Sequence, residues 1–286
     1  MNWFIYILIS AIFFTVSIIF KKKSLKNYHA MEFLSIYKIF QLLFILIFLI
    51  WFVDFKLPIN FIGIFYLIAF VHSIGLIYIT KSYRHKGVSV VSPFLNLSSF
   101  FVLILAYFIL GERISVQQIL GVAVLLIGSY LLQSTENLKK YIKTYWKHNY
   151  LFYTIFAVLL LAIASIGDKY SLNFVAPITA LCFIWAFTVM NILLFHFAFY
   201  NGLKDIKKSF KKPWKTVLIS AFAMMISNVT YYLAISQALI SLVMPIKRLS
   251  TLFDTLIGGE LFHEKKLIQK FLACIIMIIG TILIVI

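Results

Sequence analysis

Long apolar runs alternate with short polar connections along the whole chain. Ten runs approach or exceed the length of about 20 mostly apolar residues that a membrane-spanning helix needs. They cover residues 3–20, 31–53, 59–80, 88–110, 115–133, 150–167, 176–200, 214–236, 240–259 and 267–286. Most of them lack the period-two alternation of a membrane β-barrel. Because a helix satisfies its own backbone hydrogen bonds, as lipid requires, the pattern predicts an all-α integral membrane protein with ten transmembrane helices.

The composition excludes an ordinary soluble protein. Of 286 residues, 63% are hydrophobic and 12% are charged, whereas a soluble domain is about 45–50% apolar and about 25% charged. The lysines at 21–23 follow the first apolar run instead of preceding it, so we interpret that run as a retained helix and not a cleavable signal peptide. Cys182 and Cys274 fall within expected spans, which disfavours a disulfide or a zinc site. We expect no metal and no cofactor.

The basic residues are sorted between the two sides of the membrane. The chain has 26 Lys and Arg against 9 Asp and Glu, a net charge of +17. With ten spans, 20 of these cations fall in connections on one side, and only Lys56, Arg113 and Lys169 fall on the other. The positive-inside rule then places the lysine-rich side in the cytoplasm of a cell (plasma) membrane protein, with both termini outside.

The distribution of the basic residues also indicates which binding partners to expect. The cations are spread over five loops and are not interleaved with stacking aromatic residues, so we expect no nucleic-acid partner. The expected partners are the lipid bilayer and a small-molecule substrate, with the chain acting as a monomer or a homodimer.

Several motifs recur at a constant separation of 152 residues. The matches are Val91-Ser92-Pro93 with Val243-Met244-Pro245, Glu112 with Glu264, Gln117 with Gln269, and Gly128 with Gly280. Near the start of each half, Lys22 aligns with Lys169 at a separation of 147. The chain thus divides into two five-span halves, 1–135 and 150–286, joined by a basic linker at 136–149. Because five is odd, the second half enters the membrane inverted, which is typical of secondary transporters with a substrate site between the halves.

Three segments of the first half and two of the second carry a family resemblance. They are Ser89-Val-Val-Ser-Pro93, Leu110-Gly-Glu-Arg-Ile-Ser115 and Gln118-Ile-Leu-Gly121, then Ser241-Leu-Val-Met-Pro245 and Phe262-His-Glu-Lys265. Together with the ten-span repeat, they resemble the EamA-type members of the drug/metabolite transporter superfamily. The resemblance implies a transporter and covers the whole chain, but it does not specify a substrate. It also implies cytoplasmic termini, whereas the charge distribution places them outside, and we follow the charge distribution here.

The junction between the fourth and fifth spans has a structural signature. Ser115 and Gln118 have the spacing of a capping box for the fifth span. Glu112 and Arg113 are expected to serve this junction, and Glu264 the equivalent one. Pro93 and Pro245 lie near equivalent span starts, where each either permits a kink or hinge or simply begins a helix.

Ionisable residues inside the ninth span are the strongest candidates for a site. Such residues are costly in a membrane and face the protein interior or a cavity. Lys247 and Asp254 fall on one helical face, so they either form an ion pair or bind a ligand. No acidic residue of the ninth span has the i, i+3 or i, i+4 spacing that would pair it with Arg248. By the repeat it corresponds to Asn96, which shares a polar stripe with Ser92 and Ser99.

Further polar residues lie in other spans. Lys38 in the second span either faces the interior or reaches back to the lysine-rich side. His72 in the third span is either a hydrogen-bonded interior residue or a proton carrier, and His72 and Asp254 are the two candidates for proton coupling. Asn228 and Tyr231 are neighbours on one face of the eighth span.

The excess of interior positive charge favours an organic anion or a zwitterion, such as an amino acid. We expect it to bind near Arg248, Lys247 and Asn96, since guanidinium groups suit carboxylate or phosphate. The predicted function is a secondary transporter, an exporter or exchanger that works by alternating access. The alternatives are a flippase for a lipid-linked substrate or an accessory membrane subunit. A membrane-embedded transferase is less expected, because the acidic residues and histidines are scattered, and no P-loop is present.

Overall fold

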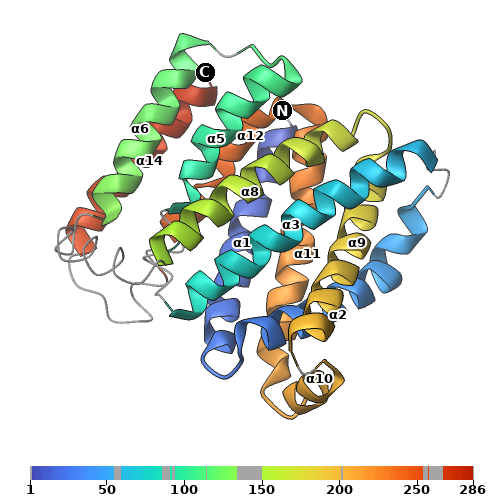
Figure 1. Cartoon of the computed structure of the whole chain (residues 1–286). Helices are drawn as coiled ribbons and strands as arrows, with labels where there is room; N and C mark the ends of the chain where they lie inside the picture. The colour runs from blue at the N-terminus through green and yellow to red at the C-terminus, as the bar shows by residue number, and fades with distance from the viewer. Residues whose placement is uncertain are drawn as a thin grey trace.

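The computed structural model describes residues 2–54, 59–85, 91, 94–113, 115–133, 150–200, 202–253, 257 and 267–285, and this part of the chain is all-helical (Figure 1). The helices are α1 (Asn2–Leu25), α2 (Ala30–Phe44), α3 (Ile59–His85), α5 (Leu97–Leu105), α6 (Val116–Gln133), α8 (Tyr150–Ser171), α9 (Pro177–Phe199), α10 (Leu203–Ser209), α11 (Trp214–Gln237), α12 (Ile240–Lys247) and α14 (Leu267–Val285). Two of them continue as other helical turns, α2 through η1 (Ile45–Leu49) and η2 (Ile50–Phe52), and α5 through η3 (Ala106–Leu110). The predicted all-α fold class is confirmed.

Each expected span contains one of these helices. Six helical segments of the described residues are long and apolar enough to cross a membrane, namely 2–25, 30–52, 61–85, 152–171, 177–199 and 214–237. Shorter apolar helices are present at Leu97–Leu110, Val116–Gly128 and Ile275–Ile284. The short helix α10 lies in a connection and was not expected.

Local sequence explains where several helices begin. The side chains of Ser115 and Gln118 each accept a hydrogen bond from the other's backbone N–H, at 3.2 Å and 3.0 Å, which confirms the predicted capping box before α6. His29 and Glu32 form a second capping box before α2. Pro177 stands at the first turn of α9, where a missing N–H costs nothing.

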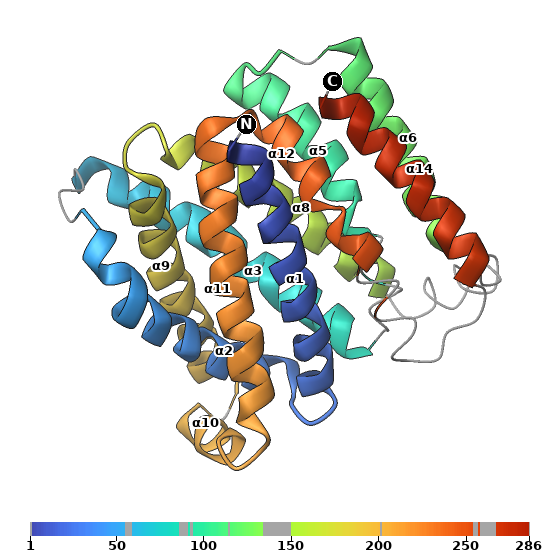
Figure 2. The ribbon, with the colours of Figure 1, turned by 180° about the vertical axis from the view of Figure 1, so that it is seen from behind.

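The helices pair across the two halves in a symmetric pattern. Counting spans within each half, α1 and α8 come first, and α3 and α11 come third. The first span of each half packs against the third span of the other, α1 along α11 and α3 along α8. The remaining spans pair with their own equivalents, α2 with α9, α5 with α12, and α6 with α14 (Figures 1 and 2). This pattern of helix pairing is expected for two structural repeats related by a pseudo-two-fold axis.

The α6–α14 pair stands at one side of the molecule (Figure 2). Glycines let the backbones of these two helices approach closely. A Cβ atom added to Gly280 would lie 2.6 Å from the backbone nitrogen of Leu125 and 2.8 Å from the carbonyl oxygen of Gly121. A Cβ atom added to Gly128 would lie 3.0 Å from the carbonyl oxygen of Ala273. These two contacts are equivalent, because adding 152 to Gly128 gives Gly280 and adding 152 to Gly121 gives Ala273. Small residues let helix backbones approach closely where no hydrophobic effect drives association.

Replacing Gly280 by leucine is therefore expected to force α6 and α14 apart, because the obstructing atoms are backbone and cannot rotate away. Overpacking typically costs about 1–3 kcal/mol, and an immovable backbone places this variant at the upper end. The measurement is the thermal midpoint of the detergent-purified protein. Gly63→Leu is the control, since a Cβ atom there has no neighbour within 4 Å. A Gly280→Leu protein as stable as Gly63→Leu would contradict this account of the helix pair.

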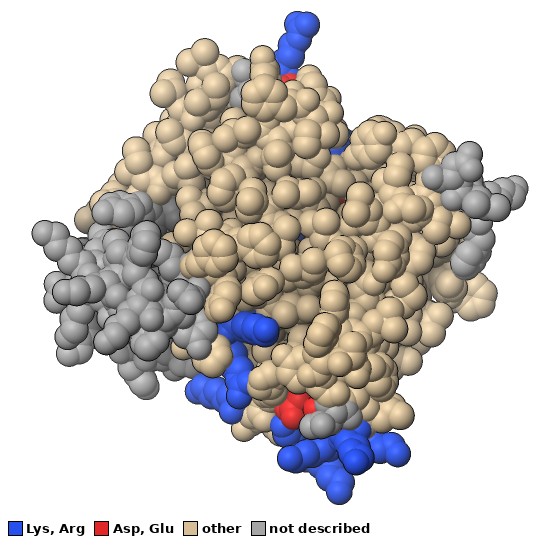
Figure 3. Space-filling view, in the orientation of Figure 1, with Lys and Arg blue, Asp and Glu red and all other residues tan. Residues whose placement is uncertain are grey.

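Charged side chains gather at the end of the molecule that carries α10 (Figure 3). Both termini lie at the opposite end (Figure 1). Several cations that hydropathy assigns to connections lie within helices, and Lys21 and Lys169 are two of them. Lys21 lies inside α1 and is only 5% exposed, so it does not belong to a connection. Lys169 lies in the last turn of α8, where its Nζ donates to the carbonyl oxygens of Ile235 and Ala238 at 2.6 Å and 3.1 Å.

Candidate functional site: a cationic cavity between the halves

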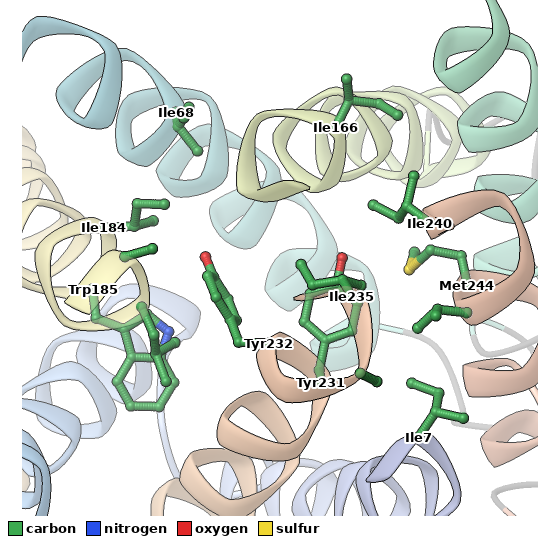
Figure 4. Packing of buried hydrophobic residues seen from close by; sticks show 14 of the residues in the cluster. Ile7, Ile68, Ile166, Ile184, Trp185, Tyr231, Tyr232, Ile235, Ile240 and Met244 are labelled. Carbon is green, nitrogen blue, oxygen red and sulfur yellow. The ribbon is translucent and has the colours of Figure 1, made fainter. Parts of the chain in front are cut away.

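A cavity of about 140 Å³ lies among helices of both halves. Its wall includes residues of α1, α2, α3, α8, α9, α11 and α12. Six of the residues singled out from the sequence line it, namely Lys38, His72, Asn228, Tyr231, Lys247 and Arg248. Figure 4 shows part of the wall, where Tyr231 and Tyr232 of α11 extend between Trp185 and Met244. Since about 10–15 Å³ is the least space that holds one water, the cavity is large enough for several water molecules.

The ninth span is interrupted at the cavity. Helix α12 ends at Lys247, a turn covers Arg248 and Leu249, and helical structure resumes at Ser250. Pro245 has no N–H, and the N–H of Arg248 is shared between the carbonyl oxygens of Met244 and Pro245 at 3.2 Å and 3.0 Å. The N–H of Thr251 then donates to the carbonyl oxygen of Arg248 at 2.9 Å, across three residues instead of four. Pro245 thus lies three residues before the break, and its proposed hinge role stays a prediction.

The fourth span has a turn residue at the equivalent position, although its backbone stays in the right-handed helical region, with φ −65° and ψ −27° at Asn96. Asn96 forms a turn directly before α5, and the N–H of Ser99 donates to its carbonyl oxygen at 3.0 Å. Asn96 and Ser99 correspond to Arg248 and Thr251 at a separation of 152. Discontinuous helices at symmetry-related positions are typical of the substrate sites of secondary transporters. Pro93 and Ser92, which precede this break, lie outside the described residues.

Polar contacts join the two interruptions. The Nε of Arg248 donates to Ser98 Oγ at 2.9 Å, and the Asn96 side-chain amide donates to Thr251 Oγ1 at 3.2 Å. Arg248 lines the cavity, whereas Asn96 is fully buried and is not among the lining residues. The structure therefore brings Asn96 and Arg248 to one region but gives only Arg248 access to the cavity.

Three lysines accompany Arg248 in the wall. Lys247 Nζ lies 3.8 Å from the ring centroid of Tyr231, and Lys38 Nζ donates to Gln41 Oε1 at 2.8 Å. Lys21 Nζ, which the sequence reasoning did not select, lies 5.4 Å from the ring centroid of Tyr83. Within the described residues, no carboxylate oxygen lies within 4.0 Å of any of these three ammonium groups. Asp254, the expected partner of Lys247, lies outside the described residues.

Among the described residues, Asp168 is the one acidic residue of the cavity wall. It is 2% exposed, its Oδ2 lies 3.3 Å from His72 Nε2, and its Oδ1 accepts a hydrogen bond from the Tyr232 hydroxyl at 2.8 Å. The sequence reasoning placed Asp168 beyond the sixth span, but α8 continues to Ser171. One signal was available, because the 147-residue separation that aligns Lys22 with Lys169 also aligns Lys21 with Asp168.

Glu112 has a structural role, but it acts at the start of α12 in the other half and not at the expected junction between the fourth and fifth spans. Its carboxylate accepts hydrogen bonds from the backbone N–H groups of Ile240 and Ser241 at 2.9 Å and 3.1 Å, and from the Ser241 hydroxyl at 2.5 Å. It thereby caps the first turn of α12, where the helix dipole favours negative charge. The residue at the end of the fourth span thus anchors the start of the interrupted ninth span. Glu264 lies outside the described residues.

Two five-helix repeats, interrupted helices and a buried polar cavity are the features of a multi-pass membrane transporter. The chain belongs to the EamA-like transporter family, whose model matches residues 1–134 and 148–286. A solved structure described only as a crystal structure of a protein is similar over 96% of this chain and 95% of that one, with a TM-score of 0.69. At 12% identity, it shows a shared fold. A search of curated proteins found no match.

Proposed function

We propose that the chain is a secondary transporter, an exporter or exchanger, of a small organic anion or zwitterion such as an amino acid. The observation that carries the proposal is the charge of the cavity wall. Lys21, Lys38 and Lys247 share the wall with a single carboxylate among the described residues, that of Asp168. Buried charge is costly unless it is compensated, and a bound anion supplies that compensation. The guanidinium group of Arg248 is suited to a carboxylate or phosphate.

The interrupted helices support alternating access between the halves. Tight turns at Asn96 and Arg248 replace regular α-helix at equivalent positions of the fourth and ninth spans, so each half carries one. A break leaves fewer backbone hydrogen bonds to hold the two parts of a span in line, which allows one part to tilt. Rocking of one repeat against the other would then expose the cavity to each side in turn.

Exchange in proteoliposomes tests this function. Purified protein is placed in liposomes loaded with an amino acid, a monocarboxylate, a dicarboxylate, a phosphate ester or an organic cation, and counterflow of the labelled compound is measured. We expect counterflow of anions or zwitterions above that of protein-free liposomes. Counterflow of organic cations alone would contradict the proposal, as would movement of a lipid-linked compound without any soluble substrate.

We also propose that His72 contributes to proton coupling, together with Asp168. Its imidazole lies 3.3 Å from the carboxylate of Asp168 and borders the cavity. Histidine serves as a proton shuttle in many proteins. A proton on this pair would alter the net charge of the wall as the substrate arrives or leaves. Asp254 stays a second candidate from the sequence.

For orientation, we propose that the α10 end faces the cytoplasm of a cell membrane. The support is the concentration of lysines there and the positive-inside rule. Single cysteines introduced at Lys208 and at Arg113, in a protein whose two native cysteines are replaced, would report the two ends. Labelling of the Lys208 site by an impermeant reagent in intact cells would contradict this orientation.

A further inference from the structure

Two tightly packed helix pairs, α1 with α11 and α3 with α8, contribute to the cavity wall (Figure 2). In the α1–α11 pair, Ser10 and Ser227 each donate a hydroxyl to the other's carbonyl oxygen, and Ser17 and Ser220 do the same, at 2.7 to 2.9 Å. In the other pair, Gly167 of α8 packs directly against α3. Contact between the two pairs is slight. Each pair is therefore a unit that can move relative to the other.

Two lysines connect one pair to the other. Lys22 Nζ, in the last turn of α1, donates to the carbonyl oxygen of Tyr83 near the end of α3 at 2.6 Å. Lys169 Nζ, in the last turn of α8, donates to the carbonyl oxygens of Ile235 and Ala238 at the end of α11. The two contacts are equivalent in the repeat, because a separation of 147 residues relates Lys22 to Lys169, and one of 152 relates Tyr83 to Ile235.

The two lysine contacts lie on opposite sides of the cavity. Ser24, two residues beyond Lys22, donates to Thr216 Oγ1 at 2.8 Å, in the first turn of α11. Lys169 instead binds the carbonyl oxygen of Ile235, in the last turn of α11. The residues of α11 that line the cavity fall between these turns, within 224–232. One contact therefore joins the helix pairs at each end of the cavity.

The residue before each lysine links its contact to the cavity wall. Lys21 Nζ lies 5.4 Å from the ring centroid of Tyr83, and Asp168 Oδ1 accepts the hydrogen bond of the Tyr232 hydroxyl at 2.8 Å. Lys21 and Asp168 are again related by 147 residues, and both line the cavity. A separation of the helix pairs at either end would therefore move a charged residue of the wall.

We infer that Lys22 and Lys169 are the two gate residues of the transport cycle, each holding the helix pairs together at its own end while the cavity opens toward the other. The inference rests on the proposed alternating access and names the residues that control it. Carbonyl groups at a helix end lack intrahelical partners, so a lysine or water can satisfy them. Either contact can therefore break and re-form without leaving a polar group unsatisfied.

The test measures access to the cavity from each side of the membrane. Ser165 lines the cavity, and Ser165→Cys, in a protein whose two native cysteines are replaced, introduces a reporter thiol of nearly the same size. An impermeant thiol reagent is applied to right-side-out and to inside-out vesicles, and the ratio of the two labelling rates is measured. Losing one hydrogen bond of a charged group shifts a two-state equilibrium by about tenfold. We expect Lys22→Met and Lys169→Met to shift the ratio by that factor in opposite directions.

Lys23→Met is the matched control, because it removes the same charge from an exposed position next to Lys22. Its ratio should equal that of the reporter protein, and so should the ratio of Lys169→Arg, which keeps a charged donor. Unchanged ratios in the folded methionine variants, or shifts in the same direction, would overturn the inference. Labelling from one side alone with both lysines intact would overturn it without any variant. Since labelling needs no transported compound, a lack of counterflow would instead contradict the proposed function.

Discussion

Replacement of Arg248 by alanine is expected to lower the rate of anion exchange by roughly 30-fold or more. Removing one member of a buried, hydrogen-bonded charge pair costs about 2–5 kcal/mol, and each 1.4 kcal/mol is a factor of ten. Arg248 is 6% exposed, lines the cavity and stands at the break of the ninth span. The measurement is the initial rate of counterflow at a substrate concentration below saturation.

Two further variants make the Arg248 result specific. Arg113→Ala removes the same side chain from an exposed position at the end of the fourth span, and its rate should be that of the wild type. Arg248→Lys keeps the charge but loses the planar fork of donors, so its rate should fall between those of the wild type and the alanine variant. An Arg248→Ala protein that is folded and exchanges anions at the wild-type rate would remove Arg248 from the site.

Replacement of Asp168 by asparagine is expected to abolish the acceleration of uptake by an imposed pH gradient. Asparagine has nearly the same shape and can still accept the hydrogen bond of Tyr232, but it cannot carry a proton. The groups around Asp168 are His72 from α3, Tyr231 and Tyr232 from α11, and Lys247 from α12. Counterflow without a gradient should persist, because exchange does not require net proton movement.

The chain offers a matched control for this experiment. His196 and Asp205 form a second histidine–carboxylate pair, with 3.5 Å between His196 Nε2 and Asp205 Oδ2, and neither residue lines the cavity. Asp205→Asn should therefore keep the gradient dependence. His72→Gln should reproduce the effect of Asp168→Asn. Full gradient dependence in Asp168→Asn would assign coupling to another group, and equal loss in Asp205→Asn would show a general electrostatic effect.

The positions of the cavity residues were only partly predictable. The sequence identified Lys38, Lys247 and Arg248 because a charged side chain inside an apolar run is costly to expose to lipid and therefore faces the protein interior or a cavity. Lys21 and Asp168 were missed for a related reason. Each stands at the edge of an apolar run, so hydropathy assigns it to a connection, while α1 and α8 continue to Leu25 and Ser171. A charged residue that lines a cavity near a helix end looks the same in sequence as a solvated loop residue.

The sequence by itself determined the helical class, the number of spans and their division into two halves, since hydropathy and spacing are properties of the chain alone. It also located the equivalent positions Asn96 and Arg248. Only the tertiary structure decided which side chains share a cavity, because that depends on pairing across the halves. The packing of α1 along α11 and of α3 along α8 brings Lys21, His72 and Asp168 to one wall. The pairing of α5 with α12 leaves Asn96 fully buried beside Arg248, where the repeat had suggested an equal role.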